Sequence, residues 1–428
     1  MNQAKVKKAP VSTPFYYGWV ITAVAGMSLF FSGPGQTYSV SIFIDYYIEE
    51  FEFSRRYISG LYSIATLVAG ILLFIIGRYV DRMGQRTVMT AAGILLALTC
   101  FWNSFLTGPV MMFMGFFMLR LFGQGSMTLL PNTLVPQWFF KRRGRALSIM
   151  AIGGFLSSAL FPPVNAFLID WMGWRLTWVF WGIMLLVMFV PSALIFVRNR
   201  PEDIGEKIDG QKSVEHKQKS SLHVEIEEKN WTLKHAMKTR AFWLILFCVS
   251  VPALVNTGIT FHLVSMMEEK GLTTETAAIV LSLMAVIGFP VTFVTGYLVD
   301  RFQVHYILMM TFVGHIAAIV LLWQVESVAG AIVYGILWGM ISGLERIVLN
   351  IVWPNYFGRE HLGSIKGIAQ TVMVLGSAFG PLPFGIFYDT FGGYDEILFV
   401  MIGLPLLAAV FAFISPKPSF EKYHSEHA

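Results

Sequence analysis

The sequence has little charge and almost no cysteine. Asp, Glu, Lys and Arg make up 13% of the 428 residues, against roughly 25% in average soluble proteins. A composition this poor in charge excludes an ordinary water-soluble domain. Cys100 and Cys248 both fall in apolar stretches, which predicts two packing residues and no disulfide.

Catalytic and cofactor signatures are also missing from the sequence. It contains no Gly-x-x-x-x-Gly-Lys-Ser/Thr loop, which argues against ATP-driven transport. It contains no His-Glu-x-x-His motif and no group of Cys and His residues with metal-ligand spacing. We therefore predict a protein that is not an enzyme and needs no cofactor or metal.

Long hydrophobic runs dominate the chain, and hydrophobic residues make up 55% of it. A helix of about 20 apolar residues crosses a hydrocarbon core of about 30 Å. The runs predict an all-α integral membrane fold with twelve transmembrane helices. Their expected spans are 17–37, 57–79, 87–106, 110–135, 145–168, 176–197, 241–264, 276–298, 304–324, 328–353, 364–388 and 394–414.

Basic residues divide unevenly between alternate loops. With both termini cytoplasmic, only Arg55, Arg56, Arg175 and Lys270 among the basic loop residues lie on the outer side. Positively charged loops favour the cytoplasmic side. We therefore predict a multi-pass protein of the cytoplasmic membrane with both termini inside. The net charge of +5 then reflects orientation in the lipid bilayer and gives no support to a nucleic-acid partner.

One loop motif occurs twice. Gly77-Arg-Tyr-Val-Asp81-Arg82-Met-Gly84-Gln-Arg86 is echoed 219 positions later by Gly296-Tyr-Leu-Val-Asp300-Arg301. Several prolines and glycines elsewhere repeat at nearly the same offset, as Gly125 does with Gly343. Duplicated helical halves are typical of secondary transporters. The sequence predicts two six-helix pseudo-symmetric halves, 1–197 and 241–428, joined by a polar cytoplasmic linker at 198–240.

These features resemble the major facilitator superfamily over essentially the full chain. Arg120-Leu-Phe-Gly123-Gln-Gly125 is similar to the family's motif in helix 4, and Gly173-Trp174-Arg175 to its turn before helix 6. The segment 138–154 and Tyr17-Gly18-Trp19 resemble the monocarboxylate porter and oxalate:formate exchanger branch. One departure is that span 276–298 has no charge, whereas these relatives place an arginine in helix 8.

The resemblance implies a secondary transporter that works by alternating access. Its expected substrate is a small organic anion, a monocarboxylate or short dicarboxylate, moved by proton coupling or by exchange. Two alternatives stay open: efflux of amphipathic drugs or metabolites by proton antiport, and a membrane sensor that binds without transporting. The oligomeric state is open, and a monomer is compatible with the sequence.

The two copies of the loop motif supply the candidates for conformational gating. An acid at a helix end can accept hydrogen bonds from a neighbouring helix N-terminus, and an adjacent base can pair with acidic groups. The alternative interpretation is turn chemistry with inward positive charge. The candidate gating residues are Gly77, Asp81, Arg82, Arg86, Gly296, Asp300 and Arg301.

Charged residues inside the spans supply the candidates for substrate binding and proton coupling. Arg120 and Arg346 are expected to bind the anion, because a guanidinium suits a carboxylate and is costly to bury without one. Glu345 and His262 are the candidate proton-coupling residues, and His315 ranks below His262 because its helix is expected at the periphery. The alternative interpretation is an internal ion pair for Arg120 and Glu345, and hydrogen-bonded packing for the two histidines.

Polar and helix-breaking residues interrupt two spans. Ser32 to Tyr38 break the apolar run of the first span, and Pro252 to Gly258 do so in the seventh. Matching interruptions in two halves point to a substrate pathway. They add Gln36, Tyr38 and Asn256 to the candidate substrate-binding residues, although ordinary helix bending is the alternative.

Overall fold

The computed structural model describes residues 10–53, 55–210 and 230–419. The lysines before the first predicted span and the middle of the predicted linker lie outside these ranges. The described chain is almost entirely helical, which confirms the all-α prediction. It divides into two compact units, Met1–Trp231 with Phe357–Ile368, and Thr232–Tyr356 with Ala369–Ala428.

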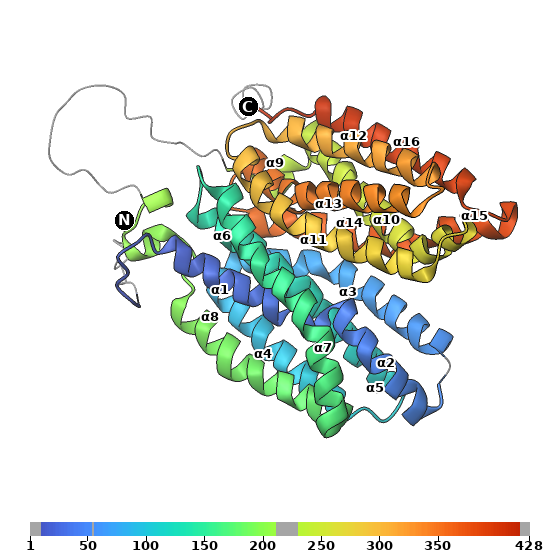
Figure 1. Cartoon of the computed structure of the whole chain (residues 1–428). Coiled ribbons are helices and arrows are strands. Elements are labelled where there is room, and N and C mark those ends of the chain that lie inside the picture. The colour runs from blue at the N-terminus through green and yellow to red at the C-terminus, as the bar shows by residue number, and fades with distance from the viewer. Residues whose placement is uncertain (1–9, 54, 211–229, 420–428) are drawn as a thin grey trace. The chain divides into compact units, whose positions relative to one another are not determined.

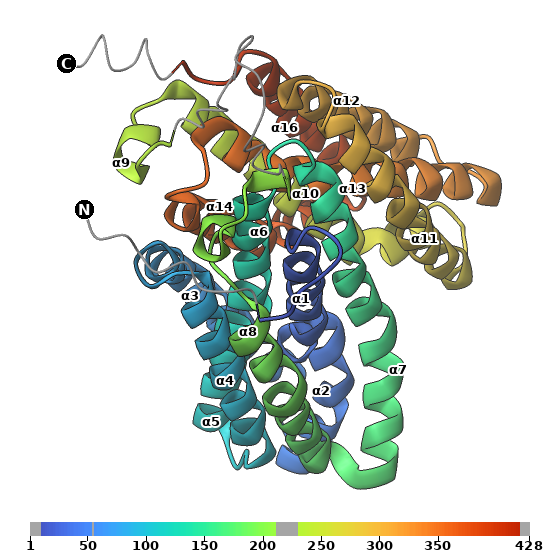
Figure 2. The same cartoon turned by 90° about the vertical axis from the view of Figure 1, so that its left-hand side faces the viewer.

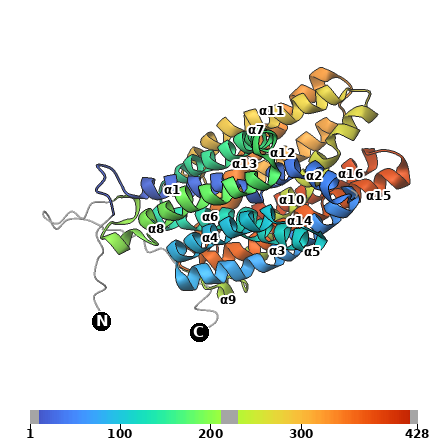
Figure 3. The same cartoon turned by 90° about the horizontal axis from the view of Figure 1, so that it is seen from below.

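Unit 1 contains the first eight α-helices. They are α1 Gly18–Phe31, α2 Thr37–Phe51, α3 Arg55–Met83, α4 Gln85–Ser104, α5 Pro109–Met118, α6 Met127–Trp138, α7 Arg143–Met184 and α8 Val190–Phe196. Helix α1 packs along α6 and α7 (Figure 1). The side and bottom views show α3 beside α5, and α4 beside α6 and α8 (Figures 2 and 3).

Unit 2 contains the helices of the second half of the chain. They are α9 Leu233–Ala236, α10 Arg240–Glu269, α11 Thr274–Val299, α12 Val304–Trp323, α13 Val328–Phe357, α14 Leu362–Phe379, α15 Pro381–Phe391 and α16 Asp395–Phe413. Helices α12 and α16 pack along each other, and α10 packs against α16 and α15 (Figure 1). The end of α13 and the first turns of α14 belong to unit 1 by their contacts.

Eleven helices in the described part of the chain are long and apolar enough to cross a membrane. Each overlaps one of the predicted spans from the second to the twelfth, so apolar length was a sound guide to these helices. The first predicted span is the exception. Residues 17–37 do not form one helix, because α1 ends at Phe31 and α2 continues to Phe51.

The break between α1 and α2 is a short 3-10 helix, Gly33–Gly35. Pro34 lacks the backbone N–H that an α-helix needs at this point. Gly35 is required by close packing, since a Cβ there would lie 2.3 Å from the carbonyl oxygen of Leu119. The predicted interruption of the first span is therefore present, and it abuts the helix that carries Arg120.

The matching interruption expected in the seventh span is absent. Helix α10 runs from Arg240 to Glu269 without a break and holds Pro252 inside it. A proline can be accommodated within a membrane helix when neighbouring groups satisfy the freed carbonyl. Pro252 to Gly258 therefore interrupt the apolar run of the sequence but do not break the helix, and Asn256 within them contacts Glu345.

Close packing of α1 on α7 gives a stability prediction. A Cβ at Gly153 would lie 1.8 Å from the backbone oxygen of Gly26, whereas a Cβ at Gly154 would meet only Leu29 at 3.8 Å. Overpacking costs about 1–3 kcal/mol. Gly153→Ala should therefore lower the thermal unfolding temperature of the purified protein, and Gly154→Ala should leave it nearly unchanged. Equal unfolding temperatures for the two variants would contradict this packing.

Candidate functional site

Arg120 lies in the interior of unit 1. It sits on a π-helix, Leu119–Ser126, that joins α5 to α6, and its exposed fraction is 7%. Irregular turns of this kind within α-helices are frequent at functional sites. Its Nη1 donates to the Gly35 carbonyl oxygen (3.3 Å) and to Thr37 Oγ1 (3.1 Å). The guanidinium also lies 5.1 Å from the centre of the Tyr62 ring.

The charge of Arg120 is not neutralised by the described part of unit 1. Its Nε has no hydrogen-bond partner, and no described carboxylate lies within 4.0 Å of the guanidinium. Arginine in the middle of a membrane helix costs about 2.5–3.5 kcal/mol on insertion scales. The structure therefore leaves donor capacity and a positive charge at this point, which is the chemistry that a carboxylate requires.

Gln36 and Tyr38 flank the residue that Arg120 contacts. Gln36 Nε2 donates to Ser32 Oγ (3.0 Å), and the Tyr38 hydroxyl donates to Ser157 Oγ (2.8 Å). Both side chains thus have partners within unit 1. These two candidates are chain neighbours of Thr37, which Arg120 contacts, but each makes an internal hydrogen bond of its own.

Glu345 lies in a buried polar group within unit 2. Its Oε2 accepts a hydrogen bond from Asn256 Nδ2 (2.8 Å), and its Oε1 lies 3.1 Å from His315 Nε2. His315 Nδ1 lies 3.1 Å from the Thr311 carbonyl oxygen. The side chains of Glu345 and His315 are 7% and 2% exposed. Three helices, α10, α12 and α13, therefore meet at one carboxylate.

His315, which ranked below His262 as a candidate, is the histidine that lies beside Glu345. Nδ1 of His262 lies 3.1 Å from the Tyr394 hydroxyl, and its ring packs against the Phe384 ring. His315 and Glu345 are 30 positions apart on different helices, so no spacing rule joins them. Burial of a histidine in mid-span was the available signal.

Arg346, the neighbour of Glu345 on α13, differs from it in exposure. Arg346 is exposed, while Glu345 is buried. Successive residues on a helix point about 100° apart, which accounts for the different exposure of this pair. The guanidinium of Arg346 makes no hydrogen bond or ion pair with a described residue. It is close enough to Glu345 for electrostatic attraction.

Asp81 accepts two backbone hydrogen bonds at the start of α14. The N–H groups of Gly363 and Ser364 donate to Oδ1 and Oδ2 at 2.9 and 2.7 Å. Helix N-termini carry partial positive charge and free N–H groups, so a carboxylate is stabilised there. Gly77 permits the approach, because a Cβ at this position would lie 2.2 Å from the Gly363 carbonyl oxygen.

The other residues of the loop motif have different surroundings. The backbone N–H of Arg86 donates to Asn199 Oδ1 (2.9 Å), and its Nε donates to the Leu194 carbonyl oxygen at the end of α8 (2.8 Å). Arg82 is exposed. In the second copy, Gly296 lies within the last turn of α11, Asp300 caps that helix, and the guanidinium of Arg301 lies 4.2 Å from the centre of the Tyr297 ring.

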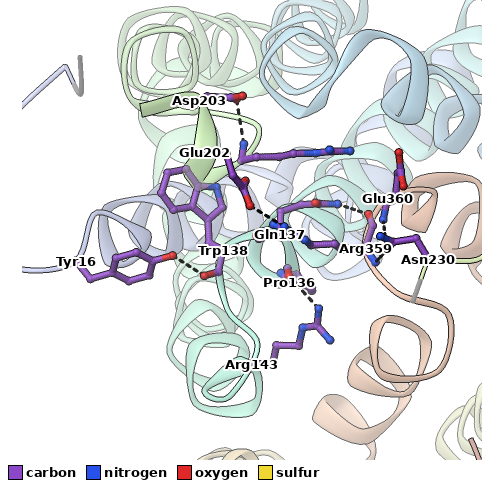
Figure 4. Close-up of polar contacts among 11 residues, drawn as sticks. Tyr16, Pro136, Gln137, Trp138, Arg143, Glu202, Asp203, Asn230, Arg359 and Glu360 are labelled. Atoms are coloured by element: carbon purple, nitrogen blue, oxygen red, sulfur yellow. Dashed lines mark hydrogen bonds and ion pairs between the residues drawn. The ribbon is translucent and has the colours of Figure 1, made fainter. Parts of the chain in front are cut away.

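Arg359 holds the segment Phe357–Ile368 to the rest of unit 1 (Figure 4). Its Nη1 donates to the Gln137 carbonyl oxygen (2.8 Å), and Gln137 Nε2 donates to the Arg359 carbonyl oxygen. Its Nη2 pairs with Glu202 Oε1 (2.7 Å). Asn230 Oδ1 accepts from the backbone N–H groups of Arg359 (3.0 Å) and Glu360 (3.3 Å). This cluster was not predicted from the sequence, because its members come from the end of α6, the segment between α8 and α9, and the turn between α13 and α14.

Residues 198–210 of the predicted linker, with Asn230 and Trp231, belong to unit 1. The Asp209 carboxylate accepts from the backbone N–H groups of Phe140 (3.1 Å) and Lys141 (2.6 Å), and Trp231 is 1% exposed. Nearby, the Tyr16 hydroxyl donates to the Trp138 carbonyl oxygen (2.5 Å), and burial raises the pKa of Tyr16 so that it remains a donor (Figure 4). Asp209 and Trp231 therefore contact the helices of unit 1, and the linker bounds 198–240 stay a prediction.

Two units of membrane-length helices, with Arg120 and Arg346 inside the spans, define a multi-pass membrane protein. The family model of the Major Facilitator Superfamily matches residues 18–381, and the chain belongs to that family. This confirms the resemblance inferred from the loop motif and from Arg120-Leu-Phe-Gly123-Gln-Gly125.

Curated relatives are distant. Monocarboxylate transporter 13 of Bos taurus is 26% identical over 414 residues, which cover 92% of this chain and 87% of that protein. The gallate transporter of Pseudomonas putida is 23% identical, with 93% and 92% covered. Riboflavin transporter MCH5 of Saccharomyces cerevisiae is 27% identical, but the match covers 57% of this chain and about half of the relative, 47%. Similarity to monocarboxylate transporters supports the branch predicted from the sequence.

A solved structure shows the same fold. The fucose:proton symporter FucP of E. coli superposes with a TM-score of 0.69 at 15% identity, and the match covers 93% of this chain and 98% of that one. The chain is therefore a multi-pass membrane transporter of the Major Facilitator Superfamily, and proteins of this class act on small molecules.

Proposed function

We propose that this protein is a secondary transporter of a small organic anion, a monocarboxylate or a short dicarboxylate, working by alternating access in the cytoplasmic membrane with both termini inside. The observation that carries the proposal is Arg120. Its guanidinium is buried in a membrane helix, bonded on one side to Gly35 and Thr37, and without a described carboxylate partner. A carboxylate substrate would supply the missing charge and acceptor.

Arg346 supports the same substrate class from unit 2. It is a second guanidinium within a membrane-length helix that has no described hydrogen-bond or ion-pair partner. Two of the relatives described above are named for monocarboxylates and gallate, which carry a carboxylate. A carrier for anions needs positive charge at the substrate and a mostly apolar surround, and both arginines meet that need.

Conformational gating is assigned to Asp81 and its loop. The Asp81 carboxylate binds the N-terminus of α14, and Arg359, in the segment that precedes α14, binds Gln137 and Glu202. By its contacts this segment, Phe357–Ile368, belongs to unit 1, whereas the chain on both sides of it belongs to unit 2. Breaking and remaking these bonds would accompany each change between inward and outward access. Gly77 permits the approach sterically, and Arg86 ties the loop to the end of α8.

The substrate class is tested by counterflow into proteoliposomes. Purified protein is reconstituted with unlabelled carboxylate inside, and labelled lactate, gallate, oxalate and succinate are offered outside, each with a neutral analogue such as the corresponding amide. We expect labelled uptake above protein-free vesicles for at least one carboxylate and none for its amide. Uptake of amphipathic cations instead would favour efflux. Saturable binding without uptake would favour a sensor and would overturn the proposal.

A further inference from the structure

We propose that Arg86 and Arg198 form a binding site for the phosphate group of an anionic phospholipid, at the end of unit 1 where α4 begins and α8 ends. The ligand is a lipid of the surrounding membrane and not the transported substrate. The inference therefore does not depend on the proposed function, and its test needs no substrate.

The two guanidinium groups meet at the last turn of α8, which packs beside α4 (Figure 2). Arg86 Nε donates to the Leu194 carbonyl oxygen (2.8 Å). Arg198 Nη1 donates to the carbonyl oxygens of Ile195 (2.9 Å) and Val197 (2.7 Å). Leu194 and Ile195 are successive residues, and successive residues of a helix rise by about 1.5 Å. The two positive groups are therefore held side by side.

This pair of charges is not neutralised by the described residues. Neither guanidinium has a described carboxylate within 4.0 Å. Burial lowers the pKa of Arg198, the charge of Arg86 lowers it further, and Tyr17 and Asp203 act in the opposite sense. Arginine nevertheless stays ionised in proteins. Two like charges held together repel each other unless an anion lies between them.

Capping of α8 explains only part of this arrangement. The C-terminus of a helix carries about half a negative charge, so one cation is enough to balance it. Both Nη atoms of Arg86 and Nη2 of Arg198 make no hydrogen bond with a described residue. The pair thus keeps positive charge and N–H donors beyond what the helix end uses. A phosphate group, which is anionic and accepts several hydrogen bonds, matches both.

The surroundings favour a lipid over a soluble anion. Arg86 lies in the first turn of one membrane-length span, and Arg198 follows the end of another by two positions. Next to them, Leu194 and Ile195 of α8 and Ile94 of α4 are 49%, 48% and 38% exposed. A phospholipid has its phosphate at the boundary of the hydrocarbon core and its chains inside it. Basic pockets between membrane helices bind such headgroups, and the exposed apolar side chains would contact the acyl chains.

Thermal unfolding in detergent micelles with added lipid tests the site. The probes are dioleoyl phosphatidylglycerol, which is anionic, and dioleoyl phosphatidylcholine, which has the same chains and a zwitterionic headgroup. A ligand that binds the folded state stabilises it. We expect phosphatidylglycerol to raise the unfolding temperature of the wild type above its value in phosphatidylcholine. Arg198→Gln and Arg86→Gln should each reduce this difference.

The difference between the two lipids separates binding from a structural role. If the arginines only cap α8, their loss should lower the unfolding temperature equally in both lipids and leave the difference intact, even in a destabilised variant. Native mass spectrometry gives the affinity directly, and Arg198→Gln should weaken phosphatidylglycerol binding by about tenfold or more. Arg198→Lys should retain part of the affinity, because lysine binds phosphate as a point charge without the planar fork.

Arg142→Gln is the matched control. Arg142 is an exposed arginine of the same unit, at the start of α7, so the variant removes the same charge from another place. It should keep the wild-type preference for phosphatidylglycerol. Equal loss of preference in Arg142→Gln and Arg198→Gln would mean general attraction to a basic surface and would overturn the site. The same unfolding temperature for the wild type in both lipids would also overturn it.

Inorganic phosphate distinguishes the two sources of a phosphate group. Added at the ionic strength of a chloride control, it should neither raise the unfolding temperature of the wild type nor displace phosphatidylglycerol in native mass spectrometry. A lipid gains from its acyl chains, which free phosphate lacks. If inorganic phosphate did both, the two arginines would bind a soluble anion and the assignment to a phospholipid would be wrong.

Discussion

Arg120→Gln should weaken transport of a carboxylate by about ten- to a hundredfold while leaving the protein folded. Hydrogen bonds to charged groups contribute about 1.5–3 kcal/mol, and each 1.4 kcal/mol is a factor of ten in binding. Glutamine can still donate one hydrogen bond to the Gly35 carbonyl oxygen, but it has no charge for the anion. The apparent affinity for the carboxylate in counterflow, measured over a range of concentrations, is the direct readout.

Thermal stability separates substrate binding from a structural role for Arg120. If the guanidinium only held the Gly33–Gly35 break, its loss would lower the unfolding temperature. If it is retained for the substrate, removing a charge that costs about 2.5–3.5 kcal/mol in the membrane should leave stability unchanged or raise it. Arg120→Lys should restore part of the affinity, because it restores charge without the planar fork. Thr37→Val removes one structural partner of Arg120 and should preserve affinity.

The outcome that would remove Arg120 from the site is specific. Wild-type affinity in folded Arg120→Gln would mean that the anion is bound elsewhere. Arg346→Gln would then be the next variant to measure, since it is the other guanidinium without a described partner. Equal loss in Arg120→Gln and Arg120→Lys, with lowered stability in both, would assign Arg120 to the helix break alone.

Apolar length predicted most helices of this fold because a membrane span must satisfy its own backbone and hide it from lipid. It failed at the first span, where Gly33, Pro34 and Gly35 break the helix and α2 then continues through a more polar stretch to Phe51. Hydropathy averages over the break and cannot see that Gly35 is needed for contact with Leu119. The presence of Pro252 was also a poor guide, because α10 continues through this proline without a break.

The chemical role of single residues was predicted better than the residues that they contact. That Asp81 could bind a helix N-terminus followed from its place at a helix end, but the helix itself begins 281 positions later, at Leu362. Burial predicted that Glu345 matters, yet its contacts with Asn256 and His315 come from two other helices. A single sequence records periodicity and motif, which are local. It carries no direct record of which helices become neighbours, and that is where the candidate site is assembled.

Asp81→Asn should release the start of α14 from the loop. The wild-type carboxylate accepts from Gly363 N and Ser364 N, and it also interacts with the positive end of the helix. Asparagine keeps one acceptor oxygen but turns an NH₂ group towards the second N–H and carries no charge. Loss of one charged hydrogen bond, about 1.5–3 kcal/mol, should speed hydrogen exchange by about ten- to a hundredfold. Mass spectrometry of a peptide spanning 357–368 measures it.

A matched control lies in the same unit. Asp209 also accepts from two backbone N–H groups, those of Phe140 and Lys141, but it does not touch α14. Asp209→Asn should speed exchange near 140 and leave 357–368 protected, whereas Asp81→Asn should do the reverse. If Asp81 is a gate and not only a turn residue, Asp81→Asn should also change the transport rate under saturating substrate. The lost hydrogen bond would shift the populations of the inward-facing and outward-facing states, and the carrier must pass through both states in each cycle. Faster exchange with an unchanged transport rate would leave Asp81 a structural role and would contradict its assignment to gating.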